Sequence, residues 1–433
     1  MGRFTRILVV ALAAMTLVAP SSAQAADASD PFFAYTGSTS LSDLKPGTVL
    51  KTRSITYTVA GVPLPIDVVQ VVFRTTNQRG QAIAGVTSVL KPPGGKTTSK
   101  VLSYQSFYDS LNPEDGPSRS IAGGTNFGGM AAHAETALVA AFLLKGYAIN
   151  FPDTEGPTAD FAAGPEYGKV TLDSVRAALK ASGTGTDSSA KVGLIGYSGG
   201  AIATNWAAVL APSYAPDVNR KLVGAAEGGV LVRPATNLTY IDGSLVWSGV
   251  LPMAVIGVSR AFGIDLKPYL SDYGVALLKK MDKVSIFQVL GAYPGLTWKK
   301  LAKAKYDNPA KVPVFVTTVN KLNLGKKPSP TIPMFIGQGK SGNLEGSLGN
   351  KPGVGKGDGV MVAGDVRTLA RAYCADGTKV LHREYALTHV TTVPLWLPAA
   401  INWMTARFDG KTAPSNCSSI KPGNPLPDFK AAS

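Results

Sequence analysis

The sequence has few of the residues on which metal, redox and nucleic-acid sites depend. It contains 2 cysteines and 3 histidines among 433 residues, and no H-E-x-x-H motif or Cys/His cluster offers a metal site. Charged residues make up only 16% of the chain, and the net charge of +15 is spread along it without a basic stripe interleaved with aromatics. No G-x-G-x-x-G motif opens the fold. We therefore expect no metal, no cofactor and no nucleic-acid partner.

The sequence also lacks an apolar run long enough to span a bilayer stably. Residues 7–18 form a short apolar run that follows Arg3 and Arg6 and precedes a small-residue segment at 21–25. This pattern is typical of a secretory signal peptide that is cut after Ala25. The sequence predicts a secreted protein, located outside the cell or in the cell envelope, with no transmembrane span.

The two cysteines are Cys374 and Cys417. In an exported protein an isolated pair usually forms a disulfide, and we expect one here. Closing a loop of about 43 residues would stabilise the fold by roughly 4 kcal/mol in the chain-entropy model. The bond would tie the C-terminal tail to the body of the protein.

Hydrophobic patterning predicts a sheet with helices on both faces. Residues 54–59, 67–73 and 84–90 alternate in polarity and are rich in β-branched residues, which favours antiparallel strands. After them strands and helices alternate, as in a mostly parallel α/β sheet. The expected strands are 101–105, 147–151, 192–195, 222–226, 332–336 and 379–385, and the expected helices are 134–144, 168–181, 201–210, 366–373 and 393–408.

The alternation stops for about a hundred residues, between about residues 229 and 331, where the sequence is apolar and helical in pattern. An insertion at this point predicts a cap over the strand ends, and an apolar cap suits an apolar substrate. A helical subdomain that merely packs on the core is the alternative. The expected segments are a signal peptide 1–25, a core 26–229 and 332–410, a helical cap or lid 230–331, and a C-terminal tail 411–433.

Residues 196–200, Gly-Tyr-Ser-Gly-Gly, match the pattern G-x-S-x-G. A strand is expected before this motif and a helix after it, and such a turn lifts Ser198 above the edge of a sheet. A plain glycine-rich turn is the structural alternative. We interpret Ser198 as a nucleophile and the amide of Gly199 as one donor of an oxyanion hole.

A serine nucleophile needs a base, normally a histidine that a carboxylate orients. In this arrangement the chain order is Ser, acid, His. His389 falls in the turn after the last expected strand and is the predicted base, with His382, inside that strand, as the alternative. The acid should follow the preceding strand. Asp358, in a Gly-Asp-Gly loop, is the predicted acid, with Asp365 and Glu345 left open.

Several segments together resemble the secretory lipases of the fungal lipase A type, which also occur in actinobacteria. The resemblance covers about residues 48–409. Its segments are SYQ at 103–105, YD at 108–109, DTEG at 153–156, GYSGGA at 196–201, SYAP at 213–216, the Asp358, Cys374 and His389 spacing, and FDG at 408–410.

The resemblance implies an α/β-hydrolase core with a mostly parallel central sheet and an inserted helical cap. It implies a triad of Ser198, Asp358 and His389, with oxyanion donors at the amides of Asp109 and Gly199. It also implies cofactor-free hydrolysis of acylglycerols and other carboxylic esters.

The chain departs from similar lipases in one respect. Residues 337–357 form a long Gly/Lys-rich loop, whereas similar lipases reach the acid within a few residues. The sequence predicts a secreted serine lipase or carboxylesterase that acts on an ester or lipid substrate through an acyl-enzyme, with a lipid–water interface left open as a partner. Acyl transfer by the same triad, and a catalytically dead fold that binds lipid, are the alternatives.

Overall fold

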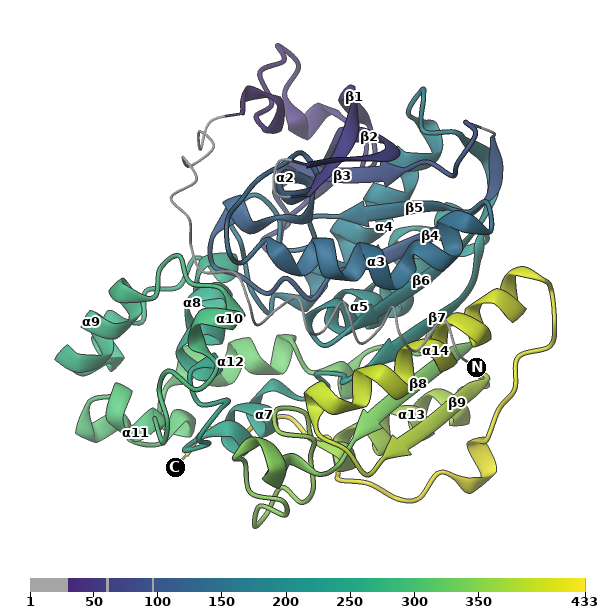
Figure 1. Ribbon diagram of the computed structural model, residues 1–433. Coiled ribbons are helices and arrows are strands. Elements are labelled where there is room, and N and C mark those ends of the chain that lie inside the picture. Colours follow the sequence, from purple (N-terminus) through teal and green to yellow (C-terminus); the bar gives the residue numbers. More distant parts are fainter. Residues whose placement is uncertain (1–29, 60–61, 96, 433) are drawn as a thin grey trace.

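A mostly parallel sheet of nine strands forms the centre of the molecule, in the order β1-β2-β3-β5-β4-β6-β7-β8-β9 (Figure 1). β1, β2, β3 and β5 pair antiparallel in succession, and all later neighbours pair parallel, as the patterning predicts. The strands are β1 (Val49–Val59), β2 (Val62–Thr76), β3 (Ala82–Leu90), β4 (Thr98–Gln105), β5 (Ala148–Pro152), β6 (Thr186–Tyr197), β7 (Leu222–Gly228), β8 (Met334–Gly339) and β9 (Val380–Tyr385).

The computed structural model describes residues 30–432 apart from 60–61 and 96. The signal peptide expected at 1–25 lies outside the described residues. Within the described part of the chain, no helix has both the length and the apolar composition that a membrane crossing requires.

Helices cover both faces of the sheet (Figure 1). Adjacent residues of the central strands face opposite layers, and both layers are apolar, as is usual for parallel strands buried on two sides. One layer holds α4 (Gly164–Lys180), α5 (Gly199–Tyr214) and α13 (Ala363–Ala375), and the other holds α3 (Met130–Leu144) and α14 (His389–Phe408).

Helix α14 begins four residues earlier than the predicted 393, at His389 itself. Thr388 is the N-cap, and its Oγ1 accepts a hydrogen bond of 3.1 Å from the amide of Thr391. The cap at Thr388 and the two prolines inside the helix, Pro394 and Pro398, together mask the helical period in the sequence. His389 is therefore held in the rigid first turn of a helix instead of in a free turn.

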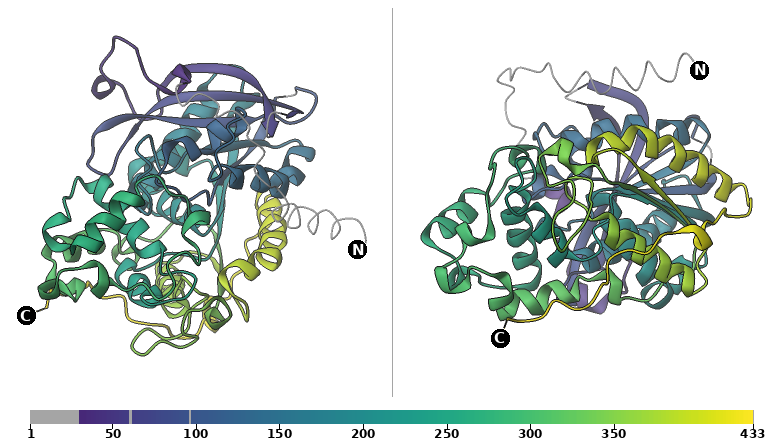
Figure 2. Two further views of the ribbon diagram at one scale, coloured as in Figure 1. Left: turned by 60° about the vertical axis from the view of Figure 1, so that its left-hand side comes forward. Right: turned by 90° about the horizontal axis from the view of Figure 1, so that it is seen from below.

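Between β7 and β8 the sheet alternation stops, as expected, and a group of helices lies to one side of the sheet (Figures 1 and 2). These helices enclose a hydrophobic cluster of their own, separate from the two layers on the sheet. They are α7 (Pro234–Ile241), α8 (Val250–Phe262), α9 (Asp272–Lys280), α10 (Ile286–Val289), α11 (Trp298–Leu301) and α12 (Pro313–Lys321).

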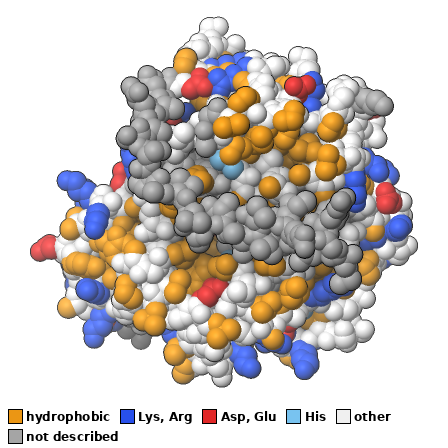
Figure 3. Space-filling view, in the orientation of Figure 1, with side chains coloured by type: hydrophobic (Ala, Val, Ile, Leu, Met, Phe, Trp, Pro, Cys, Tyr) orange, Lys and Arg blue, Asp and Glu red, His pale blue; other side chains and the backbone are white. Residues whose placement is uncertain are grey.

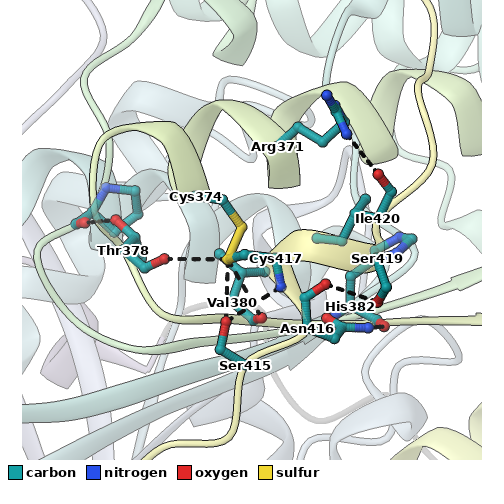
Figure 4. Close-up of a disulfide and its surroundings, with 11 residues drawn as sticks. Arg371, Cys374, Thr378, Val380, His382, Ser415, Asn416, Cys417, Ser419 and Ile420 are labelled. Carbon is teal, nitrogen blue, oxygen red and sulfur yellow. Dashed lines mark hydrogen bonds between the residues drawn. A yellow bond between two sulfur atoms is a disulfide. The ribbon is translucent and has the colours of Figure 1, made fainter.

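The C-terminal tail is tied back to the molecule at two places. Cys374, on α13, and Cys417 form the expected disulfide, with a Cα–Cα distance of 5.7 Å (Figure 4). Farther on, the tail runs to the helical insertion (Figure 2). There the side chain of Asn320, on α12, donates to the carbonyl of Phe429 at 2.9 Å and accepts from its amide at 2.7 Å. The tail therefore links the sheet layer to the inserted helices.

Replacing both cysteines, Cys374→Ser with Cys417→Ser, should lower the free energy of unfolding by up to about 4 kcal/mol, because the disulfide closes a loop of 43 residues. Equilibrium unfolding in urea measures the change, with reduced wild-type protein as the control. An unchanged free energy of unfolding in the double variant would show that the disulfide adds nothing to stability.

Candidate active site

Ser198 lies in a sharp turn between β6 and α5. Its φ of 55° and ψ of −118° are unfavourable for a residue with a side chain. The turn is held by the Ser198 amide, which donates to the carbonyl of Gly228 at 2.9 Å. A Cβ on Gly196 would overlap the carbonyl of Gly200, and a Cβ on Gly200 would overlap that of Gln105, so both positions require glycine. The strained turn presents the hydroxyl beyond the end of β6.

The structure brings Ser198, His389 and Asp358 together, although 191 and 31 residues separate them in sequence. The Oγ of Ser198 and the Nε2 of His389 are 2.8 Å apart. The Nδ1 of His389 and the Oδ2 of Asp358 are also 2.8 Å apart. The three predicted side chains thus form one continuous chain of hydrogen bonds.

Asp358 is fully buried, and its carboxylate is surrounded by donors. Its Oδ1 accepts from the amides of Val360 at 3.1 Å and Met361 at 2.7 Å. Its Oδ2 accepts from the side chain of Gln338, on β8, at 2.8 Å. The Asp358 carbonyl also accepts from the amide of His389 at 2.7 Å. These contacts fix the carboxylate and satisfy its oxygens, which a buried acid requires.

The imidazole of His389 is buried between rings and backbone. Tyr197 and Trp247 each lie 5.2 Å from it, measured between ring centroids, and a Cβ on Gly229 would overlap it. Burial works to lower the pKa of His389, but the charge and hydrogen bond of Asp358 outweigh it and raise the pKa. The site therefore favours a protonated imidazole more than water does.

The alternative residues have other partners. Asp365, on α13, accepts from the side chain of Asn424 in the tail at 2.7 Å, and burial raises its pKa to about 6. It is not the N-cap of α13, which is Val362. His382 remains on β9, where its main chain pairs with the side chain of Asn416. Neither Asp365 nor His382 joins the chain of hydrogen bonds at Ser198.

Glu345, the third alternative, does lie near His389, but its carboxylate does not bond the imidazole. It accepts from the Nε1 of Trp247 at 2.9 Å and from the amide of Val390 at 3.0 Å. Asp358 is therefore the carboxylate that bonds the imidazole of His389, whereas Glu345 bonds two neighbours of that ring.

Asp109 and Gly199, the predicted oxyanion donors, lie side by side next to Ser198. A Cβ on Gly199 would overlap the carboxylate of Asp109, and both residues line the same cavity as Ser198. The Gly199 amide is the first of α5, where a helix has no internal partner for its N–H groups. Asp109 has a strained φ of 27°, and its carbonyl accepts from the amide of Ile286, on α10, at 2.8 Å.

Burial raises the pKa of the Asp109 carboxyl to about 7, against the opposing effects of His389 and the Gly199 amide. Near neutral pH this carboxyl is therefore partly protonated. Its protonation state controls whether a negative charge lies beside the Gly199 amide.

Two buried glutamates hold the Asp109 loop and were not singled out as site residues from the sequence. Glu135, on α3, accepts from the amide of Phe107 at 2.9 Å, and Glu155 accepts from the amide of Ser110 at 3.1 Å. Burial raises the pKa of Glu135 to about 8, and burial together with the Asp109 charge raises that of Glu155. A signal for Glu135 exists, because it is the only charged residue among the apolar residues of α3.

A cavity extends from Ser198 and Asp109 into the helical insertion. Its lining is almost entirely apolar and includes Leu238 of α7, Val255 of α8 and Val319 of α12. A cavity with this lining suits an apolar ligand. Among the described residues, no group of three or more His, Cys, Asp or Glu side chains is placed to hold a metal ion.

The mostly parallel sheet, its two helical layers and the serine in a strained strand-to-helix turn define an α/β-hydrolase. The solved structure of Candida antarctica lipase A in its closed state matches with a TM-score of 0.77 and 27% identity, covering 91% of this chain and 89% of that chain.

The chain belongs to the secretory lipase family, whose family model matches residues 122–351 and 353–416. Lipase 1 of Candida albicans is 32% identical over 405 residues, covering 88% of this chain and 81% of the relative. A Mycobacterium tuberculosis protein described as a probable inactive lipase is 29% identical, covering 84% and 79%. The protein is a lipase-like carboxylic ester hydrolase, and its family implies secretion and an ester or lipid substrate.

Proposed function

We propose that the protein is a serine lipase or carboxylesterase in which Ser198 forms an acyl-enzyme. The observation that carries the proposal is the chain of 2.8 Å hydrogen bonds from Asp358 through His389 to the Ser198 hydroxyl. A hydroxyl so placed can lose its proton to the imidazole as its oxygen attacks a carbonyl carbon.

In the first half-reaction the Oγ of Ser198 bonds to the ester carbonyl carbon, and the Nε2 of His389 takes the hydroxyl proton. The tetrahedral intermediate then breaks its bond to the alcohol oxygen, which receives that proton from His389. In the second half-reaction water bonds to the acyl carbon while His389 takes its proton. The second tetrahedral intermediate then breaks its bond to the Oγ of Ser198, which regains that proton from His389, and the carboxylic acid leaves. Asp358 keeps Nδ1 protonated throughout and stabilises the imidazolium.

The amides of Gly199 and Asp109 are the proposed donors to the oxyanion. Negative charge develops on the carbonyl oxygen, so an ionised Asp109 carboxylate beside the Gly199 amide would oppose it. We infer that the protonated form of the Asp109 carboxyl is the active one. His389, in contrast, must be neutral in the resting enzyme to accept the proton.

We propose that residues 230–331 form a cap and that the cavity beneath it holds the acyl chain. The apolar lining contributed by α7, α8 and α12 supports this assignment. The cap also contacts the reaction centre directly, because Ile286 of α10 holds the Asp109 carbonyl. The disulfide supports a location outside the reducing cytoplasm, in the extracellular space or the cell envelope.

Ser198→Ala should abolish hydrolysis of p-nitrophenyl butyrate, by about 10⁴-fold or more in kcat, because no other group supplies the nucleophile. Ser213→Ala, at an exposed position on the same helix, is the control and should match the wild type. Activity surviving in the Ser198 variant would exclude the acyl-enzyme. An unreactive wild type that also resists a fluorophosphonate probe would favour the catalytically dead fold.

The dependence of kcat/KM on pH should be bell-shaped. The rate rises as His389 loses its proton, and it falls as Asp109 ionises with a pKa of about 7. Asp109→Asn cannot ionise, so the decline on the alkaline side should disappear while the acidic side remains. Asp428→Asn, in the exposed tail, is the control. An alkaline decline that persists in the Asp109 variant would contradict this role for the carboxyl.

An exposed apolar patch lies beside the triad and supports docking at a lipid–water interface. The main chain of Leu245 bonds that of Gly346, and the amide of Val390 bonds the side chain of Glu345, so these segments meet at one corner. On the face shown in Figure 3, hydrophobic side chains are grouped and Lys and Arg lie mainly around the rim. Apolar surface of this kind favours adsorption to lipid. The patch consists of Leu245, Leu344, Leu348 and Val390, with exposed fractions of 60%, 72%, 59% and 54%.

Leu344→Ser combined with Leu348→Ser should weaken adsorption to a triolein emulsion several-fold, because it removes apolar surface from the contact. Hydrolysis of a dissolved short-chain ester should not change. Leu144→Ser, at the end of α3 and 79% exposed, is the matched control and should adsorb as the wild type does. Equal adsorption of both variants would exclude this patch as the docking surface.

A further inference from the structure

In the long loop between β8 and Asp358, a second carboxylate lies close to His389. The 3-10 turn Gly342–Glu345 of this loop ends at Glu345, whose two oxygens have different partners. Oε2 accepts from the indole Nε1 of Trp247, in the helical insertion, at 2.9 Å. Oε1 accepts from the amide of Val390, the second residue of α14, at 3.0 Å.

Both partners of Glu345 adjoin His389. Trp247 is only 4% exposed, and its ring lies 5.2 Å from the imidazole at an interplanar angle of 83°. Val390 follows His389 in the chain, so its amide fixes the start of the helix that carries the imidazole. One carboxylate therefore constrains His389 through a packed ring and through the main chain.

The hydrogen-bonded side chains of Glu345 and Trp247 also pack against the loop that carries Asp358. A Cβ on Gly359, the residue after Asp358, would overlap both the Trp247 Nε1 and the Glu345 Oε2. The same loop is anchored by Ser347, whose hydroxyl donates to the carbonyl of Gly359 at 2.5 Å. The acid loop, the inserted helices and the start of α14 thus meet at Glu345.

The charge of Glu345 also acts on the base. It is one of the negative groups that raise the pKa of His389, together with Asp358 and Asp109. Glu345 cannot replace Asp358, because both of its oxygens face N–H groups other than the imidazole.

We propose that Glu345 is a positioning residue that locks the His389 imidazole between Ser198 and Asp358, through Trp247 and the Val390 amide, and whose charge favours the imidazolium formed during the reaction. The proposal rests on the proposed function, because it assumes that His389 is the base. It gives the long loop after β8 a role that a short connection to the acid would not provide.

The test is the pH dependence of kcat and kcat/KM for a dissolved p-nitrophenyl ester in Glu345→Gln. Removing a nearby negative charge should lower the midpoint of the acidic side by roughly 0.5 to 1 pH unit. An amide also presents a donor to one of the two N–H groups, so the imidazole loses its alignment. We expect kcat to fall by about tenfold and KM to stay within about twofold.

Trp247→Phe removes the indole N–H and keeps an aromatic ring beside the imidazole. It should lower kcat and leave the midpoint of the acidic side in place. The double variant should be no slower than Glu345→Gln alone, because both changes break one bond. Additive losses would overturn the proposed link through Trp247.

Should Glu345→Gln fail to fold, Glu345→Asp retains the charge on a shorter side chain. The proposal then requires an unchanged midpoint of the acidic side with a reduced kcat.

Glu384→Gln is the matched control. It removes the same charge from β9, where Glu384 pairs with Lys340 and Arg367, and it should not move the midpoint. Equal behaviour of Glu345→Gln and Glu384→Gln would overturn the proposal. Ser198→Ala, measured alongside, distinguishes a failure of the Glu345 proposal from a failure of the proposed function. If the Ser198 variant stays active, the proposed acyl-enzyme mechanism itself is wrong.

Discussion

The hydrogen bond between Asp358 and His389 is the interaction on which the rest of the site depends. It places a carboxylate with no exposed surface against a buried imidazole, and a buried charge is tolerated only where donors surround it. Gln338 and the two amides after Asp358 supply those donors. The side chain of Gln338, the tight turn after Asp358 and the start of α14 are therefore parts of one arrangement, which holds the buried carboxylate and directs it at the imidazole of His389.

The sheet supplies the frame in which this arrangement is possible. In a parallel sheet the carboxyl ends of the strands share one edge, so the segments that follow β6, β8 and β9 bring Ser198, Asp358 and His389 to the same place. The helical insertion follows β7 at that edge of the sheet and contributes to the site in two ways. Ile286 holds the strained carbonyl of Asp109, and Trp247 packs against the imidazole. The segment that encloses the cavity is thus also in contact with the Asp109 loop and with the imidazole of His389, so a change in its packing reaches both.

Much of this was accessible from the sequence because the signals were local or scarce. The G-x-S-x-G motif predicts a strand before Ser198 and a helix after it. Because the chain has only 3 histidines, the prediction of His389 as the base was nearly a matter of elimination. The cysteine pair was the only pair available. The contacts of Glu155 and Glu345 were not accessible, because each bonds amides or rings from segments far away in the chain. Glu135 stands out as the one charged residue of α3, but no spacing rule gives its partners. The early start of α14 was missed for a different reason, since a threonine cap and two internal prolines hide a helix from its period.

The buried carboxyl groups around Asp109 suggest why the oxyanion loop can be strained and still be well defined. Asp109, Glu135 and Glu155 each have a raised pKa, and the charge of Asp109 raises the pKa of both glutamates. Three such groups cannot all be ionised without strong repulsion, so protons are a structural part of this region. The glutamates accept from the amides of Phe107 and Ser110 on either side of Asp109, and those bonds hold its φ of 27° in place. Near neutral pH the Asp109 carboxyl is itself partly protonated beside the amide of Gly199, so the geometry and the charge of this loop depend on the same buried carboxyl groups.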